Sequence, residues 1–287
     1  MAALSSSIRR WTVWFLLATV FAVACWFLSQ WQLARLNEVK GVISRINQNY
    51  DAQPAELAQL LTSSAKFDAQ NEYRPVEVSG GYQWMNTALV RNRPLNGQPG
   101  FEVFAPFELT NGKIVFVDRG WLATGTNQDL PDRIVLPPKV QVSLIGRIKQ
   151  SAADSGRNYD KQAQLQLGAP SAIEAARALN LPAASFYDDF YLILDSESAG
   201  DGSTLMRDAA LKPLLRPEYT EGNHLSYAMQ WILFALMAFF AIGWAIRQEL
   251  LHRKAALDPT FVVKKRRAVG SIDAEVEDAL VDSSSPK

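Results

Sequence analysis

The run GNHLSYAMQWILFALMAFFAIGWAI, residues 222–246, is the strongest structural signal in this sequence. It lies between Glu221 and Arg247 and contains no formal charge. Because a helix needs ~20 apolar residues to cross a bilayer core, the stretch predicts a transmembrane helix over residues 223–246. Its polar side chains gather in the first turns and include His224, so the helix begins with an imidazole at one membrane surface.

A second long uncharged run covers residues 11–34, and its most apolar part is 12–28. No small-residue cleavage site follows this part, because the next residues are WFLSQW at 26–31. The run therefore predicts an uncleaved transmembrane helix over residues 11–31 rather than a signal peptide. A lipoprotein processing site ahead of Cys25, the single cysteine, is the alternative, but the bulky apolar residues that follow argue against it.

The cations that flank the two spans predict their orientation. Arg9 and Arg10 precede the first span, and residues 247–267 hold seven basic and two acidic residues. Cytoplasmic flanks accumulate Lys and Arg, so we expect residues 1–10 and 247–287 in the cytoplasm and residues 32–222 in the periplasm. The location expected is the inner (cell) membrane of a bacterium. The tail is first basic and then acidic and serine-rich, and its last part, 271–287, has a composition typical of disorder.

Residues 32–222 predict a mainly antiparallel β domain with a few short helices. The clearest signal is a hairpin in which Asn111-Gly112 joins residues 101–109 to residues 113–118. Helices are expected at 33–50, as a continuation of the first span, and at 54–64 and 170–179. Other strands are expected at 76–82, 88–91, 140–148 and 190–194, and a long loop at 152–167.

The expected fold class is thus a membrane protein in which two transmembrane α-helices flank an α+β, mainly antiparallel β extracytoplasmic domain. Alternation of apolar residues alone leaves open whether this domain closes into a barrel. The tripeptide Arg119-Gly120-Trp121 ends the predicted hairpin. It is interpreted either as a surface that contacts a partner protein or as a strand end with a packed tryptophan.

The residues that usually carry catalysis are scarce. The chain has two histidines and one cysteine, and it lacks a glycine-rich phosphate loop and a zinc-protease motif. A Ser-His-Asp triad would have to use His224 or His252, so a membrane-tethered hydrolase is the weakest interpretation and we expect no enzyme. The 29 basic and 29 acidic residues balance, which gives no reason to expect a nucleic-acid partner.

Several segments, taken in order, resemble those of a known family. They are GYQWMNTALVRNRPLNGQPGFEVFAPFELTNGKIVFVDRGWL at 81–122, VSLIGRI at 142–148, YLILD at 191–195 and EGNHLSYAMQW at 221–231. Together with one span before and one after, they are similar to the Surfeit locus protein one family, the assembly factors of cytochrome c oxidase. The resemblance implies a non-enzymatic role in maturing oxidase subunit I, with haem a bound transiently and delivered.

The same resemblance implies that His224 is a haem contact. Haem iron takes an axial ligand such as imidazole, so His224 is the candidate metal ligand. Tyr227 and Trp231 follow one and two turns later on roughly the same face and are the other candidate cofactor-binding residues. The alternative is that the histidine contacts lipid headgroups and that the two aromatic residues only anchor the helix at the interface.

Three functions therefore remain. The first is a haem a carrier and chaperone whose partners are oxidase subunit I, the haem a synthesis machinery and the lipid bilayer. The second is a cofactor-free membrane scaffold that stabilises an oxidase assembly intermediate. The third is the hydrolase. The oligomeric state and the particular oxidase served do not follow from the sequence.

Overall fold

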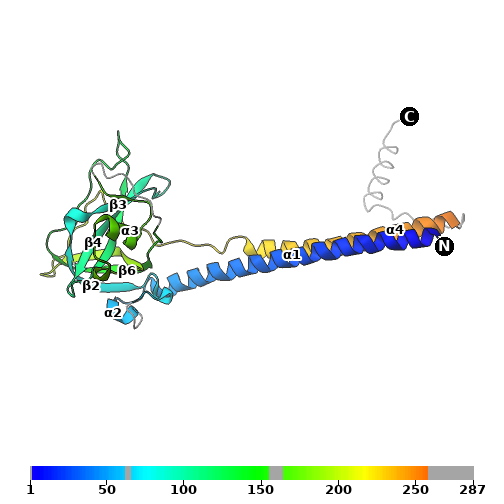
Figure 1. The fold of residues 1–287 in the computed structure, drawn as a ribbon, viewed down its shortest axis with the longest axis horizontal. Coiled ribbons are helices and arrows are strands. Elements are labelled where there is room, and N and C mark those ends of the chain that lie inside the picture. Colours follow the sequence, from blue (N-terminus) through cyan, green and yellow to red (C-terminus); the bar gives the residue numbers. More distant parts are fainter. Residues whose placement is uncertain (1, 62–65, 155–163, 258–287) are drawn as a thin grey trace, which may run out of the picture. The chain divides into compact units, whose positions relative to one another are not determined.

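The computed structural model describes residues 2–61, 66–154 and 164–257 (Figure 1). The chain divides into two compact units. The helical unit consists of Met1–Leu36 and Gly222–Lys287, and the β unit consists of Asn37–Glu221. The expected disordered tail, the basic residues 264–267 and the middle of the expected loop 152–167 lie outside the described residues.

Two long helices dominate the helical unit. Helix α1 spans Ala2–Asn49 and helix α4 spans His224–Leu257. Both are long and apolar enough to cross a membrane. The expected fold class, two transmembrane helices that flank a β-rich domain, is confirmed. The first span also continues as a helix over most of residues 33–50, as its spacing predicts.

Helix α4 continues past the apolar run and includes the first residues of the expected tail. No glycine or proline occurs between residues 247 and 257 to end it. Glu249 and Arg253 also form an ion pair of 2.5 Å one turn apart, an arrangement that supports helix.

The two helices of the helical unit pack antiparallel (Figure 1). Phe15 contacts Phe239 with ring centroids 5.7 Å apart. Gln32, further along α1, is hydrogen bonded to His224 at the start of α4. Cys25 and Ser29 of α1 are buried, as is Ala228 of α4. Small side chains allow helix backbones to approach closely, which is how membrane helices usually associate.

The described part of the β unit contains eight strands. They are β1 (Ala55–Glu56), β2 (Pro75–Tyr82), β3 (Ala88–Val90), β4 (Gly100–Leu109), β5 (Ile114–Ala123), β6 (Gln141–Gln150), β7 (Gln166–Leu167) and β8 (Phe190–Ala199). Its short helices are α2 (Leu57–Leu60) and α3 (Ala172–Ala178), with single 3-10 turns at Ala69–Asn71, Trp84–Asn86 and Ala183–Ser185.

Five of these strands close into a barrel. Strand β2 pairs with both β6 and β4, β4 pairs with β5, β5 pairs in parallel with β8, and β8 pairs with β6. The ring is a small five-stranded barrel of the OB type. Closure removes the free edges that an open sheet would expose.

A glycine allows the ring to close. Gly80 lies opposite Leu109 where β2 meets β4. A Cβ at position 80 would lie 2.0 Å from the carbonyl oxygen of Glu108. Only a residue without a side chain permits this approach of the two strands.

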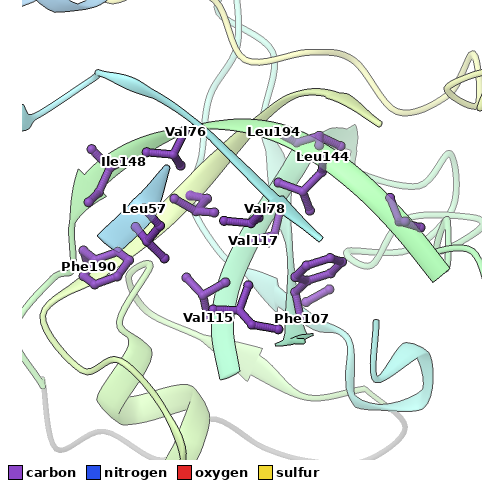
Figure 2. Packing of buried hydrophobic residues seen from close by; sticks show 14 of the residues in the cluster. Leu57, Val76, Val78, Phe107, Val115, Val117, Leu144, Ile148, Phe190 and Leu194 are labelled. Carbon is purple, nitrogen blue, oxygen red and sulfur yellow. The ribbon is translucent and has the colours of Figure 1, made fainter. Parts of the chain in front are cut away.

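Apolar side chains fill the barrel (Figure 2). Alternate residues of each strand point inward, such as Val76 and Val78 of β2 and Val115 and Val117 of β5. Leu57 of α2 packs on the same cluster. The outer face carries a second cluster, in which Ala172, Ala175 and Ala176 of α3 pack with residues of β3, β4, β5 and β8.

Three predicted elements differ from those observed. Within the described residues, the predicted helix at 54–64 is reduced to β1 and the single turn of α2, because residues 55–56 pair with β2. Residues 62–64 of this prediction lie outside the described residues. Strand β5 continues to Ala123, so Arg119-Gly120-Trp121 lies within a strand rather than at its end. Strand β8 continues to Ala199 because β6 pairs along its whole length.

Candidate functional site

The candidate site begins at the first residue of α4. The carbonyl of Asn223 accepts the first helical hydrogen bond, from the backbone N–H of Tyr227 at 3.0 Å. Gly222 precedes it with φ of +64°, a conformation that favours glycine. The chain therefore turns sharply into the helix and presents His224 on the first turn.

His224 is hydrogen bonded to the other long helix. Its Nδ1 lies 2.8 Å from Oε1 of Gln32. Both side chains are half-buried. No residue within the described ranges forms a hydrogen bond with Nε2 of His224, so one ring nitrogen is engaged and the other is open.

The backbone leaves the open edge of the ring accessible. A Cβ at Gly222 would lie 3.6 Å from both Nε2 and Cδ2 of His224. Any side chain at this position would therefore cover that edge of the imidazole. A glycine here serves both the turn and the access to Nε2.

The two aromatic residues expected at the site follow along α4. Tyr227 and Trp231 lie three and seven residues after His224, which places them on roughly the same helix face. Tyr227 is 50% exposed. Trp231 is half-buried and packs edge-on against Phe234, with ring centroids 5.8 Å apart. His224, Tyr227 and Trp231 thus follow one another along roughly one face of α4.

These residues fit a haem with one protein ligand. An imidazole whose Nδ1 is hydrogen bonded and whose Nε2 is open matches the usual geometry of a metal-binding histidine. Apolar aromatic rings suit the porphyrin plane. In the described residues, no group of three or more His, Cys, Asp or Glu side chains could hold a metal ion.

The tripeptide Arg119-Gly120-Trp121 does not lie on the surface, which differs from the expected partner contact. Arg119 is 4% exposed and Trp121 is 1% exposed. The Trp121 Nε1 donates to the carbonyl of Arg93 at 2.5 Å, and its backbone pairs with Lys212. Gly120 adopts φ of +133°, and a Cβ there would lie 2.5 Å from the Lys212 carbonyl oxygen. The burial favours the interpretation as a packed strand.

Arg119 instead belongs to a buried polar network in the barrel. Its Nη2 lies 2.9 Å from Oε1 of Glu197, and the Tyr82 hydroxyl donates to Oε2 of Glu197 at 3.1 Å. Arg119 Nη1 also donates to the Val135 carbonyl. Burial, with the nearby Glu197 carboxylate, raises the pKa of Tyr82. Tyr82 therefore stays protonated and can donate its hydroxyl proton to Glu197.

A second buried cluster holds two carboxyl groups. Glu102 forms an ion pair of 2.8 Å with Arg93, and Asp118 accepts a hydrogen bond from the backbone N–H of Gly120. Asp118 is 1% exposed, and its Oδ2 has no hydrogen-bond partner among the described residues. Burial and the neighbouring Glu102 raise the pKa of Asp118 well above its usual range. The alternation of apolar residues does not predict these two buried carboxyl groups, because both lie on strands whose pattern indicates an apolar core.

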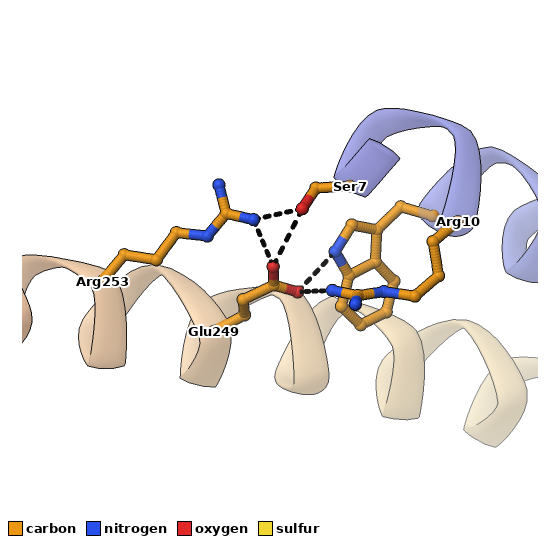
Figure 3. Close-up of polar contacts among 5 residues, drawn as sticks. Ser7, Arg10, Glu249 and Arg253 are labelled. Carbon is orange, nitrogen blue, oxygen red and sulfur yellow. Dashed lines mark hydrogen bonds and ion pairs between the residues drawn. The ribbon is translucent and has the colours of Figure 1, made fainter. Parts of the chain in front are cut away.

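A third polar cluster joins the two helices of the helical unit (Figure 3). Glu249 of α4 accepts hydrogen bonds from Arg10 Nη2 at 2.5 Å and from Trp11 Nε1 at 2.7 Å. Arg253 Nη2 donates to Glu249 and to the Ser7 hydroxyl. Glu249 lies 25 residues after His224, or about 37 Å along the helix. It therefore fixes the opposite end of the helix pair and takes no part in the His224 site.

The chain is similar to several known proteins. The profile of a family described as the SURF1 family matches residues 19–236. An uncharacterized SURF1-like protein of Mycobacterium bovis is 24% identical over 245 residues, which cover 85% of this chain and 86% of that protein. A Mycobacterium tuberculosis protein with the same description matches equally. A SURF1-like protein of Dictyostelium discoideum is 27% identical over 115 residues, 38% of this chain and 43% of its own length.

Proposed function

Because this chain belongs to the SURF1 family, the Surfeit locus protein one family, we propose that it is an assembly factor for cytochrome c oxidase. In this proposal it binds haem a through His224 and aids its insertion into subunit I. Its partners are then subunit I, the haem a synthesis machinery and the lipid bilayer. The protein acts as a carrier rather than as an enzyme.

The observation that carries the proposal is the open Nε2 of His224 at the first turn of α4. Gln32 holds the opposite ring nitrogen, and Gly222 adds no side chain over the open edge. An imidazole so oriented is a ready axial ligand for haem iron.

The cargo would be held loosely enough to be handed on. His224 supplies one coordination bond, and Tyr227 and Trp231 supply apolar contacts along the helix. The long apolar tail of haem a would extend beside Trp231 and Phe234 into the bilayer. A cargo with a single protein ligand is released when one bond is broken, which suits delivery better than permanent storage.

The location proposed is the inner membrane of a bacterium, with both termini in the cytoplasm and the β unit in the periplasm. Arg9 and Arg10 flank the first helix, and Arg247, Arg253 and Lys254 follow the apolar run of the second. Cations of this kind mark cytoplasmic flanks. His224 would then lie at the periplasmic surface of the membrane.

The test uses the full chain purified in detergent from a host that makes haem a. We expect a Soret band that is lost in His224→Ala. His252→Ala is the matched control, because it removes the other histidine of the chain, and it should keep the band. Helical circular dichroism establishes that both variants fold. A wild-type protein without haem, or an unchanged band in His224→Ala, contradicts the proposal.

A cofactor-free scaffold is the second candidate. Two large apolar side chains of the β unit are strongly exposed, Met85 at 77% and Met206 at 94%, and exposed apolar side chains can serve as contacts for another protein. A colourless wild-type protein that still co-purifies with oxidase subunit I would support this alternative.

A further inference from the structure

The hydrogen bond between His224 and Gln32 joins the two long helices. Gln32 is 192 residues before His224 and lies on α1, whereas His224 begins α4. The atoms joined are the imidazole Nδ1 and the amide Oε1, at 2.8 Å. Gln32 therefore meets the ring on the side opposite Nε2.

Gln32 lies on the face of α1 that packs against α4. Cys25, Ser29 and Leu36, at helical spacing around it, are buried at 1%, 0% and 5% exposure. Gln30, two residues earlier, is exposed and points to another side of the helix. A glutamine on the packing face is held in place by its neighbours, so its amide meets the imidazole in a fixed direction.

The chemistry of this contact selects one form of the ring. A neutral imidazole carries one N–H and one lone pair. An amide oxygen accepts a hydrogen bond and cannot donate one, so Nδ1 must carry the proton and Nε2 must carry the lone pair. Hydrogen bonds of this type fix the tautomer and raise the basicity of metal-binding histidines.

We propose that Gln32 is the positioning residue of the His224 site, which holds the Nδ1–H tautomer and directs the Nε2 lone pair toward the iron. The part of this inference that concerns haem iron rests on the proposed function. It makes the site a property of the helix pair, because α4 supplies the ligand and α1 supplies the group that orients it.

The first experiment needs no haem. The full chain is labelled with ¹⁵N-histidine in detergent at alkaline pH, where imidazole is neutral. The chain has two histidines, so all histidine signals of the His252→Ala variant come from His224. We expect a protonated Nδ1 and an unprotonated Nε2 in the wild type, and a shift toward the Nε2–H form in Gln32→Leu. An Nε2–H ring in the wild type overturns the proposal.

The second experiment titrates haem a into the haem-free protein and follows the Soret band. Groups that hydrogen bond to metal-binding histidines contribute about 10–100-fold in metal affinity, so Gln32→Leu should lose haem affinity in that range. Gln32→Glu retains an acceptor oxygen and should bind as the wild type does or better. The matched control is Gln30→Leu, which changes an exposed glutamine on the same helix and should have no effect.

A spectroscopic readout separates positioning from a general loss of structure. The iron–imidazole stretching frequency, measured by resonance Raman on the ferrous complex, should fall in Gln32→Leu and rise in Gln32→Glu, since it follows the hydrogen bond at Nδ1. Equal affinities and equal frequencies in the wild type and Gln32→Leu overturn the proposal.

The two proposals fail differently. A wild-type protein that binds no haem a but shows the Gln32-dependent Nδ1–H ring refutes the carrier function and leaves the positioning contact in place. A protein that binds haem a with an Nε2–H ring, or with no dependence on Gln32, refutes the positioning role alone.

Discussion

At the scale of single residues, Arg119 shows how burial changes the role of a charged side chain. An arginine at the end of a predicted hairpin suggests a surface contact. In the barrel it forms a buried ion pair with Glu197, and both side chains are almost fully enclosed. The pair costs desolvation, so it contributes little net stability as a pair, but removing one partner leaves a charge buried alone.

We therefore expect Arg119→Ala to lower the free energy of unfolding by about 3–5 kcal/mol. The comparison is Arg133→Ala, which breaks the ion pair with Asp208, where Arg133 is 65% exposed. Exposed pairs contribute about 0–1 kcal/mol. Chemical denaturation of the full chain in detergent, followed by the circular dichroism of the β sheet, measures both. Equal effects of the two variants would show that Glu197 is not left unpaired.

The raised pKa of Asp118 should make the stability of the fold depend on pH. Its pKa is raised in the folded protein by burial and by Glu102. Above the ordinary carboxyl pKa of ~3.9, the unfolded chain releases this proton while the folded chain retains it. The folded state then binds more protons, so its stability falls as the pH rises through this window.

Asp118→Asn should remove this decline. We expect the variant to gain stability over the wild type as the pH rises from about 4 to 7, by about 1.4 kcal/mol for each unit by which the pKa is raised. Thermal unfolding across this range measures the difference.

Asp201 is the opposite control, because hydrogen bonds from Ser203 lower its pKa. Asp201→Asn should lose stability relative to the wild type as the pH rises through the lowered pKa toward the ordinary one. A pH-independent difference for Asp118→Asn would contradict the raised pKa.

At the scale of elements, the junction of β2 with β4 determines whether the strands form a sheet or a barrel. Each strand is recognisable from its alternation, but the closing contact depends on Gly80, the first of two adjacent glycines that face different neighbours. Gly80 faces the backbone of Glu108, whereas Gly81 faces the flexible side chain of Gln141 at 3.3 Å.

Gly80→Ala should therefore destabilise the β unit by about 1–3 kcal/mol, the usual cost of overpacking. Gly81→Ala should have a small effect, because the Gln141 side chain can move aside. The difference between these adjacent variants, measured by thermal unfolding, isolates the backbone contact from the loss of glycine flexibility. Similar melting temperatures for both would mean that β2 and β4 separate at little cost.

At the scale of the whole molecule, the proposed function requires His224 to face the periplasm. Labelling with a membrane-impermeant maleimide tests this in a Cys25→Ser background, which removes the single native cysteine. Met206→Cys, at a position 94% exposed on the β unit, should react in intact spheroplasts. Leu257→Cys, at a position 86% exposed near the end of α4, should react only after permeabilisation. The reverse pattern would place the candidate site in the wrong compartment.

Features that depend on local composition follow from the sequence alone. The lengths of the two apolar runs predict helices that can cross a membrane, and the Asn111-Gly112 turn predicts the β4–β5 hairpin. Both predictions hold because the deciding residues lie within the element itself. Strands β5 and β8 are longer than their sequence pattern predicts, because their extra length comes from pairing with distant strands.

Features that depend on residues far apart in the chain emerge only in the folded molecule. Barrel closure follows from the approach of Gly80 to Leu109, and the role of Arg119 follows from Glu197 on another strand. The contact between Gln32 and His224 spans 192 residues. Periodicity shows which face of an element is apolar, but packing alone determines which partner covers that face and which polar groups meet there.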